Sequence, residues 1–405
     1  MARERADLVI VGAGTIGGWA SVFAREAGLP NVVVLEREQA GAGASGRAAG
    51  MVRAQGGIPD TVRLGSWSIA FYRGQRDRYD TDSGFMQRGY VILATTARGE
   101  RAARDRIAMQ RAVGLDARWV DVEEIRRLIP AMAGDGYRGG SYVATDGWID
   151  PPRNVRSYSL AMQRAGVSVR EGTGFVGIRT RAGRRGRREV TAVATTAGTI
   201  ATPRVLLTGG PALQSVAAAA GARAWVGYVR HQVAVTEPSD ALQADSTAMA
   251  FDLDAGLYWR PEEGGLLWGM SNPKEAPGPG RSIDWPYLRA MERRLHRFVP
   301  ATRGLGLKKV WAATIEYTPD HLPIVGPLVL GDGTEIDGAS IASACGHGMM
   351  WGPAVSRIAI DLVLEGATEV VERPEDLRMD RFDANGRSPF VDPIALPFPV
   401  QVDED

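Results

Sequence analysis

The stretch DLVIVGAGTIGG, from Asp7 to Gly18, decides the fold. Its apolar first half predicts a buried strand from Asp7 to Val11, and the residues Ile16 to Ala27 predict a helix. A second strand is predicted from Val32 to Glu36. The chain therefore opens with a strand–helix–strand unit, which is the setting in which glycines at G-x-G-x-x-G spacing bind a dinucleotide.

Three glycines of this stretch, Gly12, Gly14 and Gly17, have that spacing. The first allows a tight turn, the second lets the backbone approach a pyrophosphate, and the third permits close helix–strand packing. Glu36 ends the second strand about 20 residues further on, where an acid accepts hydrogen bonds from the adenosine ribose. The same carboxylate would repel the extra phosphate of NADP. The motif itself does not separate NAD from FAD.

Composition limits the class of protein. A chain of 405 residues predicts two domains, and 48 basic against 47 acidic residues leave a net charge of +1, too weak to gather nucleic acid or an anionic membrane. A single cysteine, Cys345, excludes an internal disulfide framework and fits a reducing compartment, so we expect a cytoplasmic protein. The four histidines lack ligand spacing and predict no metal site. No apolar run approaches the roughly 18 residues of a transmembrane helix.

One basic run, at 179–188, falls between two predicted strands and indicates a solvated hairpin loop rather than a nucleic-acid site. Further glycine-rich stretches follow the opening unit. They are the loop at 41–57, the strand end VLLTGG at 205–210, and GHG at 346–348. Together they suggest several contacts to one long ligand, which favours FAD over NAD.

Five stretches in order carry a family resemblance: VIVGAGTIGG, ASGRAAGMVR, VLLTGG, YTPDHLPIVGP and GHGMMWGPAVSRIAIDLV. To about residue 382 the chain resembles the superfamily of D-amino-acid oxidase, glycine oxidase and sarcosine oxidase, which are FAD-dependent amine oxidoreductases. The resemblance implies an α/β fold (α+β overall), with a Rossmann-like discontinuous FAD-binding domain and a substrate domain that carries a large mixed β-sheet. The expected division is an FAD-binding domain at 1–84, 147–221 and 308–382, a substrate domain at 85–146 and 222–307, and a C-terminal tail at 383–405 that wraps the surface or is partly disordered.

The resemblance also implies a reaction: oxidation of the carbon–nitrogen bond of an amino acid or N-alkyl amino acid to the imine, by hydride transfer to flavin N5. Arg53 falls where sarcosine oxidase-like members place an arginine that binds the substrate carboxylate; a surface or FAD-phosphate arginine is the alternative. Tyr258 aligns with a pocket tyrosine, or is a packed core aromatic. Arg260 is a second anion contact or a solvated strand end. His347 belongs to a stretch that approaches the isoalloxazine, where an acid–base role is weaker than a structural one.

The expected FAD contacts come from the glycine-rich stretches and their neighbours. They are Gly12, Gly14, Ile16, Gly17, Glu36, Arg37, Ser45, Gly46, Arg47, Gly50, Met51, Val176, Thr208, Gly209, Gly210, Gly346, His347, Gly348, Met349 and Met350. FAD is expected to bind noncovalently, because Ala313 stands in place of the flavin-bonding cysteine of sarcosine oxidase and Arg47 in place of the flavin-bonding histidine of some dehydrogenases. Cys345 is then expected to be a small buried residue.

The electron acceptor stays open between oxygen and another carrier, a protein or a quinone. Leu267 and Met350 stand where oxygen-reactive relatives carry lysines, which puts oxygen reactivity in doubt. Two other classes remain: a member of the superfamily that retains FAD but acts as an assembly or interaction factor, and an NAD-dependent dehydrogenase. The oligomeric state and the identity of the substrate are not determined by the sequence.

Overall fold

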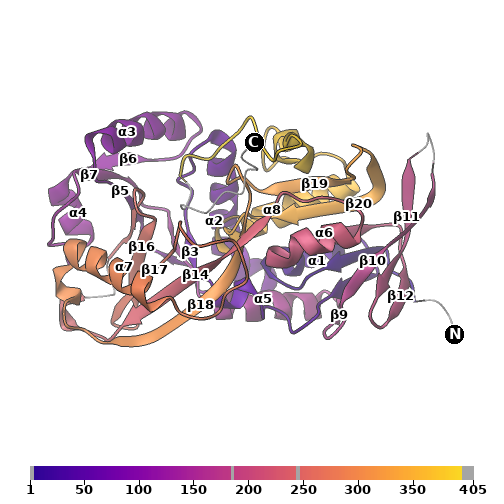
Figure 1. The fold of residues 1–405 in the computed structure, drawn as a ribbon, viewed down its shortest axis with the longest axis horizontal. Coiled ribbons are helices and arrows are strands. Elements are labelled where there is room, and N and C mark those ends of the chain that lie inside the picture. Colours follow the sequence, from indigo (N-terminus) through magenta and orange to yellow (C-terminus); the bar gives the residue numbers. More distant parts are fainter. Residues whose placement is uncertain (1–3, 184–186, 243–246, 395–405) are drawn as a thin grey trace.

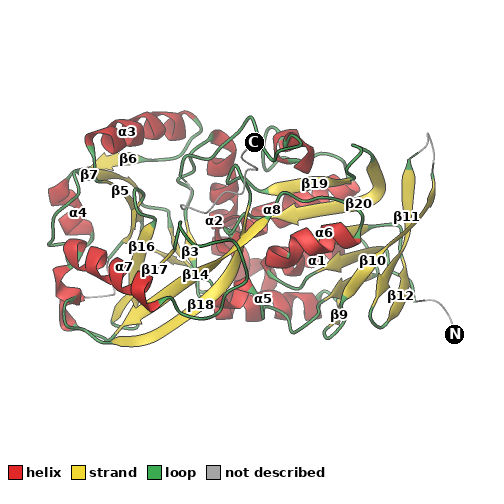
Figure 2. Cartoon of the chain, viewed as in Figure 1, coloured by secondary structure: helices red, strands yellow, loops and turns green. Residues whose placement is uncertain are grey.

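The computed structural model describes residues 4–183, 187–242 and 247–394. These residues form two large β-sheets that lie toward opposite ends of the long axis of the molecule (Figure 1). Helices lie against both sheets, and the longest strands run into the region between the two halves (Figure 2).

The first sheet contains the opening strand–helix–strand unit, which confirms the predicted Rossmann-like fold. Its centre is parallel, in the order β20-β13-β1-β2-β9, so the carboxyl ends of these strands meet at one edge. Three further strands extend this sheet beyond β20, and β19 pairs with β20. The strands are β1 (Leu8–Val11), β2 (Val32–Leu35), β9 (Ser168–Arg170), β10 (Phe175–Ala182), β11 (Arg188–Thr195), β12 (Gly198–Ala201), β13 (Val205–Leu207), β19 (Ile324–Val329) and β20 (Glu335–Ser343).

Both faces of the parallel strands are buried, which explains why β1 reads as a continuous apolar run. Leu8 and Ile10 face a layer of four helices, whereas Val9 and Val11 face the opposite core with α6 (Leu213–Ala219). The helices of the first layer are α1 (Thr15–Glu26), α2 (Pro59–Tyr79), α5 (Pro151–Arg164) and α8 (Gly348–Leu364). The predicted first helix is thus confirmed to within one residue at each end.

The second sheet has the order β18-β14-β17-β16-β15-β5-β7-β6 and is antiparallel except where β15 meets β5. It is the large mixed sheet that the resemblance implied. Its strands are β5 (Tyr90–Ala94), β6 (Arg118–Val120), β7 (Gly139–Val143), β14 (Gly227–Thr236), β15 (Met249–Asp252), β16 (Leu257–Glu262), β17 (Gly265–Ser271) and β18 (Leu307–Tyr317). The helices of this half are α3 (Ala97–Ala112), α4 (Val122–Leu128) and α7 (Trp285–Phe298).

Alternation along the strands of the second sheet separates an outer face from an inner one. Val91 and Trp259 belong to an outer core with α4 and α7, whereas Tyr90, Phe251 and Tyr258 belong to an inner cluster. The inner face looks toward the first sheet and supplies one wall of the site described below.

Shorter elements connect the two halves. A small sheet joins β3 (Met51–Val52), β8 (Gly147–Trp148) and β4 (Met86–Gln87). Six 3-10 turns complete the described elements: η1 (Ala44–Arg47), η3 (Gly210–Ala212), η4 (Asp240–Leu242), η6 (Pro300–Thr302), η7 (Pro374–Leu377) and η8 (Met379–Arg381).

The second sheet crosses one bound of the expected domain division. The division returns the chain to the FAD-binding part at residue 308, but β18 pairs with β14 along almost its whole length and so lies in the second sheet. The basic run at 179–188, predicted to be a loop between strands, begins inside β10 and reaches the first residue of β11, its antiparallel partner. Residues 184–186 of the run lie outside the described part. Of the expected surface tail, Asp392 and Ile394 are buried, and 395–405 lie outside the described residues.

Candidate functional site

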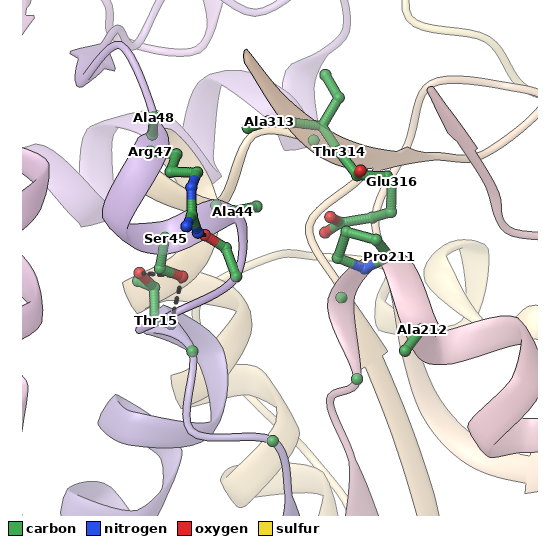
Figure 3. Close-up of a pocket in the computed structure, with 18 of the residues that line it drawn as sticks. Thr15, Ala44, Ser45, Arg47, Ala48, Pro211, Ala212, Ala313, Thr314 and Glu316 are labelled. Carbon is green, nitrogen blue, oxygen red and sulfur yellow. Dashed lines mark hydrogen bonds between the residues drawn. The ribbon is translucent and has the colours of Figure 1, made fainter. Parts of the chain in front are cut away.

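A cavity of about 920 Å³ lies between the carboxyl edge of the parallel strands and the inner face of the second sheet. Val11, Leu35 and Thr208 line it from the first half, and Phe251 and Tyr258 line it from the second. Figure 3 shows Ser45 and Arg47 on one side of the pocket and Pro211, Thr314 and Glu316 on the other. This volume is at the upper end of the range of about 300–1,000 Å³ for small-molecule sites. The cavity therefore suits a ligand as long as a dinucleotide.

The glycine turn after β1 is built for close backbone approach. Gly12 has φ +105°, and a Cβ there would lie 2.8 Å from the Thr208 carbonyl oxygen. At Gly17 a Cβ would lie 1.9 Å from the Gly12 carbonyl oxygen. Thr208 joins the ends of β13 and β1, because its hydroxyl donates to the Val11 carbonyl at 2.9 Å. Side chains at Gly12 or Gly17 would therefore break the contact between α1 and the strand ends.

Glu36 is held at the mouth of this turn. Its Oε2 accepts the Ala13 amide at 3.0 Å and its Oε1 accepts the Glu38 amide at 2.9 Å. These bonds fix the carboxylate on the cavity wall, where it retains lone pairs for hydroxyl donors.

The loop after β2 closes over the start of α1. The Ser45 hydroxyl accepts the Thr15 amide at 3.0 Å, a contact drawn in Figure 3. Arg47 donates to the Ala42 carbonyl, and the indole of Trp311 on β18 donates to the Arg47 carbonyl at 2.9 Å. The second sheet thereby positions the loop of the first.

Most residues predicted as cofactor contacts line the cavity. They are Gly12, Gly14, Ile16, Glu36, Arg37, Ser45, Arg47, Gly50, Met51, Thr208, Gly209, Gly210, Gly346, His347, Gly348, Met349 and Met350. Three do not line it. Gly17 packs behind the turn, and Gly46 packs on the Gly41 carbonyl. Val176 on β10 is 54% exposed, and its strand neighbour Phe175 lines the cavity instead, because alternate residues of a strand point to opposite sides. Thr173 and Gly174, which precede the strand, line the cavity as well.

The third glycine stretch turns the chain into α8. Cys345 and Gly346 have φ +51° and +73°, and α8 begins at Gly348 without a side-chain cap. The backbone amides of this turn can therefore serve a bound anion or carbonyl. His347 Nδ1 lies 2.7 Å from the Cys345 carbonyl, so Nδ1 is the donor and Nε2 an acceptor. Burial lowers the pKa of His347 to about 3, which leaves the imidazole neutral at pH 7.

Cys345 is a buried structural thiol. Its sulfur accepts the Thr318 amide at 3.3 Å and the Thr318 hydroxyl at 3.0 Å. Burial raises the pKa of the thiol to about 12, so the nucleophilic thiolate is absent at neutral pH.

Arg53 lies at the end of the cavity formed by both sheets. It is buried, and its guanidinium donates to the Gln55 carbonyl and, at 3.0 Å, to the Ile394 carbonyl. Two of its five N–H donors are thus committed, and the residue lines the cavity. Asp146 lies near it. This carboxylate accepts the Ala54 amide at 2.8 Å and the Gln55 side chain at 3.0 Å, and burial raises its pKa to about 7.

Tyr258 reaches the cavity from β16 with a partner that the sequence did not single out. Its hydroxyl hydrogen-bonds to Nε2 of His231 on β14, and Nδ1 of His231 lies 2.8 Å from the Ser271 hydroxyl on β17. Burial lowers the pKa of His231 to about 4 and raises that of Tyr258 above its usual value. Both groups are therefore neutral at pH 7, and they present a polar, uncharged surface to a ligand.

The sequence did not predict several other lining residues. They are Tyr90, Tyr228, His231, Phe251, Arg281, Thr314 and Glu316. Alternation marks the inward positions of a strand, but it does not say which face meets a ligand. Glu316 contributes the acidic side chain of this set. Burial raises the pKa of its carboxyl, which lies near the backbone of Gly346.

Two residues compared with relatives lie off the cavity lining. Arg260 is neither a solvated strand end nor a cavity residue, because it is buried, donates to the Ala49 carbonyl at 2.9 Å and pairs with Glu262. Leu267 is buried in the inner cluster with Tyr258. Within the described ranges, no group of three or more His, Cys, Asp or Glu side chains is arranged to hold a metal ion. No helix in that same part of the chain has the length and apolar character to cross a bilayer.

The model of a known family, FAD dependent oxidoreductase (DAO), matches residues 7–362. The chain belongs to this family. Mitochondrial sarcosine dehydrogenase of Mus musculus is 26% identical over 360 residues, covering 84% of this chain and 39% of that protein. Glycine oxidase of Geobacillus kaustophilus is 26% identical over 372 residues, covering 89% of this chain and 93% of that protein. This DAO-family chain thus spans about two fifths of the length of the dehydrogenase.

Solved structures agree on the fold. L-proline dehydrogenase from P. horikoshii superposes with a TM-score of 0.84 at 22% identity, covering 94% of this chain and 98% of that one. Glycine oxidase from Geobacillus kaustophilus gives 0.78 at 22% identity, covering 94% and 100%. The predicted fold class and family are confirmed, and the family is one of FAD-dependent oxidoreductases. The glycine turns, where a Cβ would fill the approach to the backbone, and the long cavity fit that cofactor.

Proposed function

We propose that this protein oxidises the carbon–nitrogen bond of an amino acid or N-alkyl amino acid to the imine, with Arg53 binding the substrate carboxylate. One observation carries the proposal: a buried guanidinium on the wall of a cofactor-sized cavity, at the end where two sheets meet. Names of relatives, among them sarcosine dehydrogenase and glycine oxidase, point to the same substrate class.

FAD, when bound, supplies the acceptor for a hydride from the carbon beside nitrogen. The residues proposed to hold it are the cavity-lining members of the four glycine-rich stretches, with Glu36 on the ribose and the start of α8 on the flavin. Noncovalent binding is supported by Ala313 and Arg47, which line the cavity and offer no thiol or imidazole. Cys345 does not line the cavity and is protonated.

The side chains at the substrate end of the cavity orient the substrate and exclude water from it. Arg53 pairs with the carboxylate, and this fixes the neighbouring carbon relative to the cofactor. Neutral His231, His347 and Tyr258 leave the amine free to bind without charge repulsion. The electron acceptor is proposed to be a carrier other than oxygen, because neither Leu267 nor Met350 supplies a cation beside the flavin.

Anaerobic bleaching of the bound flavin tests the proposal. Glycine, sarcosine, proline and other D- or L-amino acids are offered, with dimethylamine as a control that matches the amine of sarcosine but lacks the carboxylate. Reduction by an amino acid and not by dimethylamine is expected, and slow reoxidation in air would support a carrier other than oxygen. If no compound bleaches the flavin, the alternative of an FAD-retaining assembly factor is favoured.

Replacement of Arg53 tests its role directly. Arg53→Ala should retain FAD. It should weaken binding of the amino acid that reduces the flavin by at least about 30-fold, because loss of one partner of a buried charge pair costs about 2–5 kcal/mol. An unchanged KM and kcat for this variant would remove Arg53 from the site.

A further inference from the structure

The chain's C-terminal segment, Asp392–Ile394, enters the substrate end of the cavity wall. Ile394 is 1% exposed and packs in the inner cluster with Tyr90, Phe251 and Tyr258, all three of which line the cavity. Its carbonyl accepts the Nη2 proton of Arg53 at 3.0 Å, across 341 positions of sequence. A segment outside both sheets therefore contacts the guanidinium proposed to bind substrate.

Asp392 fastens this segment. It is 1% exposed, and its carboxylate oxygen Oδ1 accepts a hydrogen bond from the Ile394 amide at 2.8 Å. The other carboxylate oxygen, Oδ2, lies 3.5 Å from the Gly57 amide. The backbone amide of Asp392 donates to the Asp320 carbonyl at 3.0 Å. The bond to the Ile394 amide sets the direction of the peptide whose carbonyl follows. Removal of the carboxylate would thus release the carbonyl that Arg53 uses.

Gly57 leaves the space in which the segment lies. A Cβ at Gly57 would meet Asp392 Oδ1 at 2.1 Å and Pro393 Cδ at 2.5 Å, both below any real contact distance. Gly57 comes four residues after Arg53 and does not line the cavity. A methyl group here would displace the C-terminal segment while it leaves the cofactor contacts in place.

Charge favours the same arrangement. Arg106 on α3 is close enough to Arg53 for the two positive charges to repel, and burial and this repulsion lower the pKa of Arg106. Asp392 acts on Arg106 in the opposite direction. Burial lowers the pKa of His321, and the charges of Asp320 and Asp392 only oppose that shift. The Asp392 carboxylate therefore offsets the positive charge of Arg106 beside Arg53, and it also ties down the backbone.

We propose that Asp392–Ile394 is a positioning element of the substrate site, which holds the guanidinium of Arg53 in the plane that receives a carboxylate and closes the apolar wall behind Tyr258 and Phe251. The inference rests on the proposed function of Arg53. With the Ile394 and Gln55 carbonyls taking two N–H groups, the guanidinium cannot rotate freely, so a carboxylate meets donors already oriented. The hydrogen bonds of this segment go to Arg53, Gly57 and Asp320 and to the segment itself, so its effect should fall on carboxylate binding.

The test measures binding of acetate, with uncharged acetamide as its isostere, by the change in the flavin absorption spectrum of the holoenzyme. Gly57→Ala and Asp392→Ala are each expected to weaken acetate binding by at least 10-fold and to leave FAD content and acetamide binding unchanged. Asp392→Asn keeps an oxygen for the Ile394 amide and should restore acetate binding to within about threefold of wild type. Gly74→Ala, at an exposed helical glycine with open space, is the matched glycine control.

Each result decides the inference. Wild-type acetate binding in whichever of Gly57→Ala and Asp392→Ala retains FAD overturns it, and so does equal loss of acetate and acetamide, which would indicate a general structural defect. Asp392→Ala adds no atom to the interior and remains informative if Gly57→Ala does not fold. If Arg53→Ala also binds acetate normally, or if the wild-type protein does not bind acetate, the proposed carboxylate role of Arg53 is wrong together with the positioning role. If Arg53→Ala loses acetate binding while Gly57→Ala and Asp392→Ala keep it, only the positioning role of Asp392–Ile394 is wrong.

Discussion

Asp146 should give this protein a pH-dependent stability that one substitution removes. Burial raises the pKa of its carboxyl from an ordinary 3.8 to about 7 in the folded protein. Between these two values the unfolded chain loses the proton and the folded chain keeps it, so stability falls as pH rises. Three pKa units at 1.36 kcal/mol each amount to about 4 kcal/mol, fully lost above pH 7.

Asp146→Asn cannot titrate. Its Oδ1 can still accept the Ala54 amide, but its amide group faces the Gln55 side-chain nitrogen, and this donor–donor contact costs about 1–3 kcal/mol. The variant should therefore be less stable than wild type at pH 4.5 and more stable at pH 8, with the two curves crossing between. Because Asp146 also faces Arg53, the variant should bind acetate more tightly than wild type above pH 7.

Urea unfolding of the holoenzyme at half-unit steps from pH 4.5 to 8, followed by tryptophan and flavin fluorescence, measures the difference between the two proteins at each pH. Asp77→Asn, at an exposed position of α2, controls for the general effect of removing a carboxylate. A wild-type-minus-variant difference that stays constant across this range would show that Asp146 titrates normally, and the reasoning from burial would be wrong.

Two further changes follow from close contacts. Gly17→Ala places a methyl group 1.9 Å from the Gly12 carbonyl oxygen, so α1 must move away from the strand ends. We expect the variant to lose most of its bound FAD, measured by the flavin-to-protein absorbance ratio, and about 1–3 kcal/mol of stability, measured by urea unfolding. Retention of FAD by this variant would contradict the prediction. In the wild-type protein, Arg381 binds the buried carboxylate of Asp320 through two hydrogen bonds of 2.6 and 3.0 Å. Arg381→Leu leaves this carboxylate without its partner and should lower the free energy of unfolding, measured in urea, by about 3–5 kcal/mol. Adding Asp320→Leu should recover part of this loss. Additive losses in that double variant would show that the pair is not coupled.

The sequence by itself determined the cofactor half of this protein. Gly12 and Gly17 form a local unit, because a turn between a strand and a helix fixes their relative positions within a few residues and only glycine fits the backbone contacts. The later glycine stretches were found for the same reason: conformational needs of the backbone are visible one residue at a time. Glu36 was found because it stands at the end of the strand that follows this helix in the same strand–helix–strand unit.

The substrate end was decided by tertiary structure. Arg53 could be named from the family pattern, but its contact with Ile394, and the pairing of Tyr258 with His231, join residues that no local pattern connects. Val176 was misplaced because one position along a strand exchanges the faces. Strand register and the path of the C-terminal segment depend on the packing of whole sheets, and that packing is a sum of many distant contacts that sequence spacing does not record.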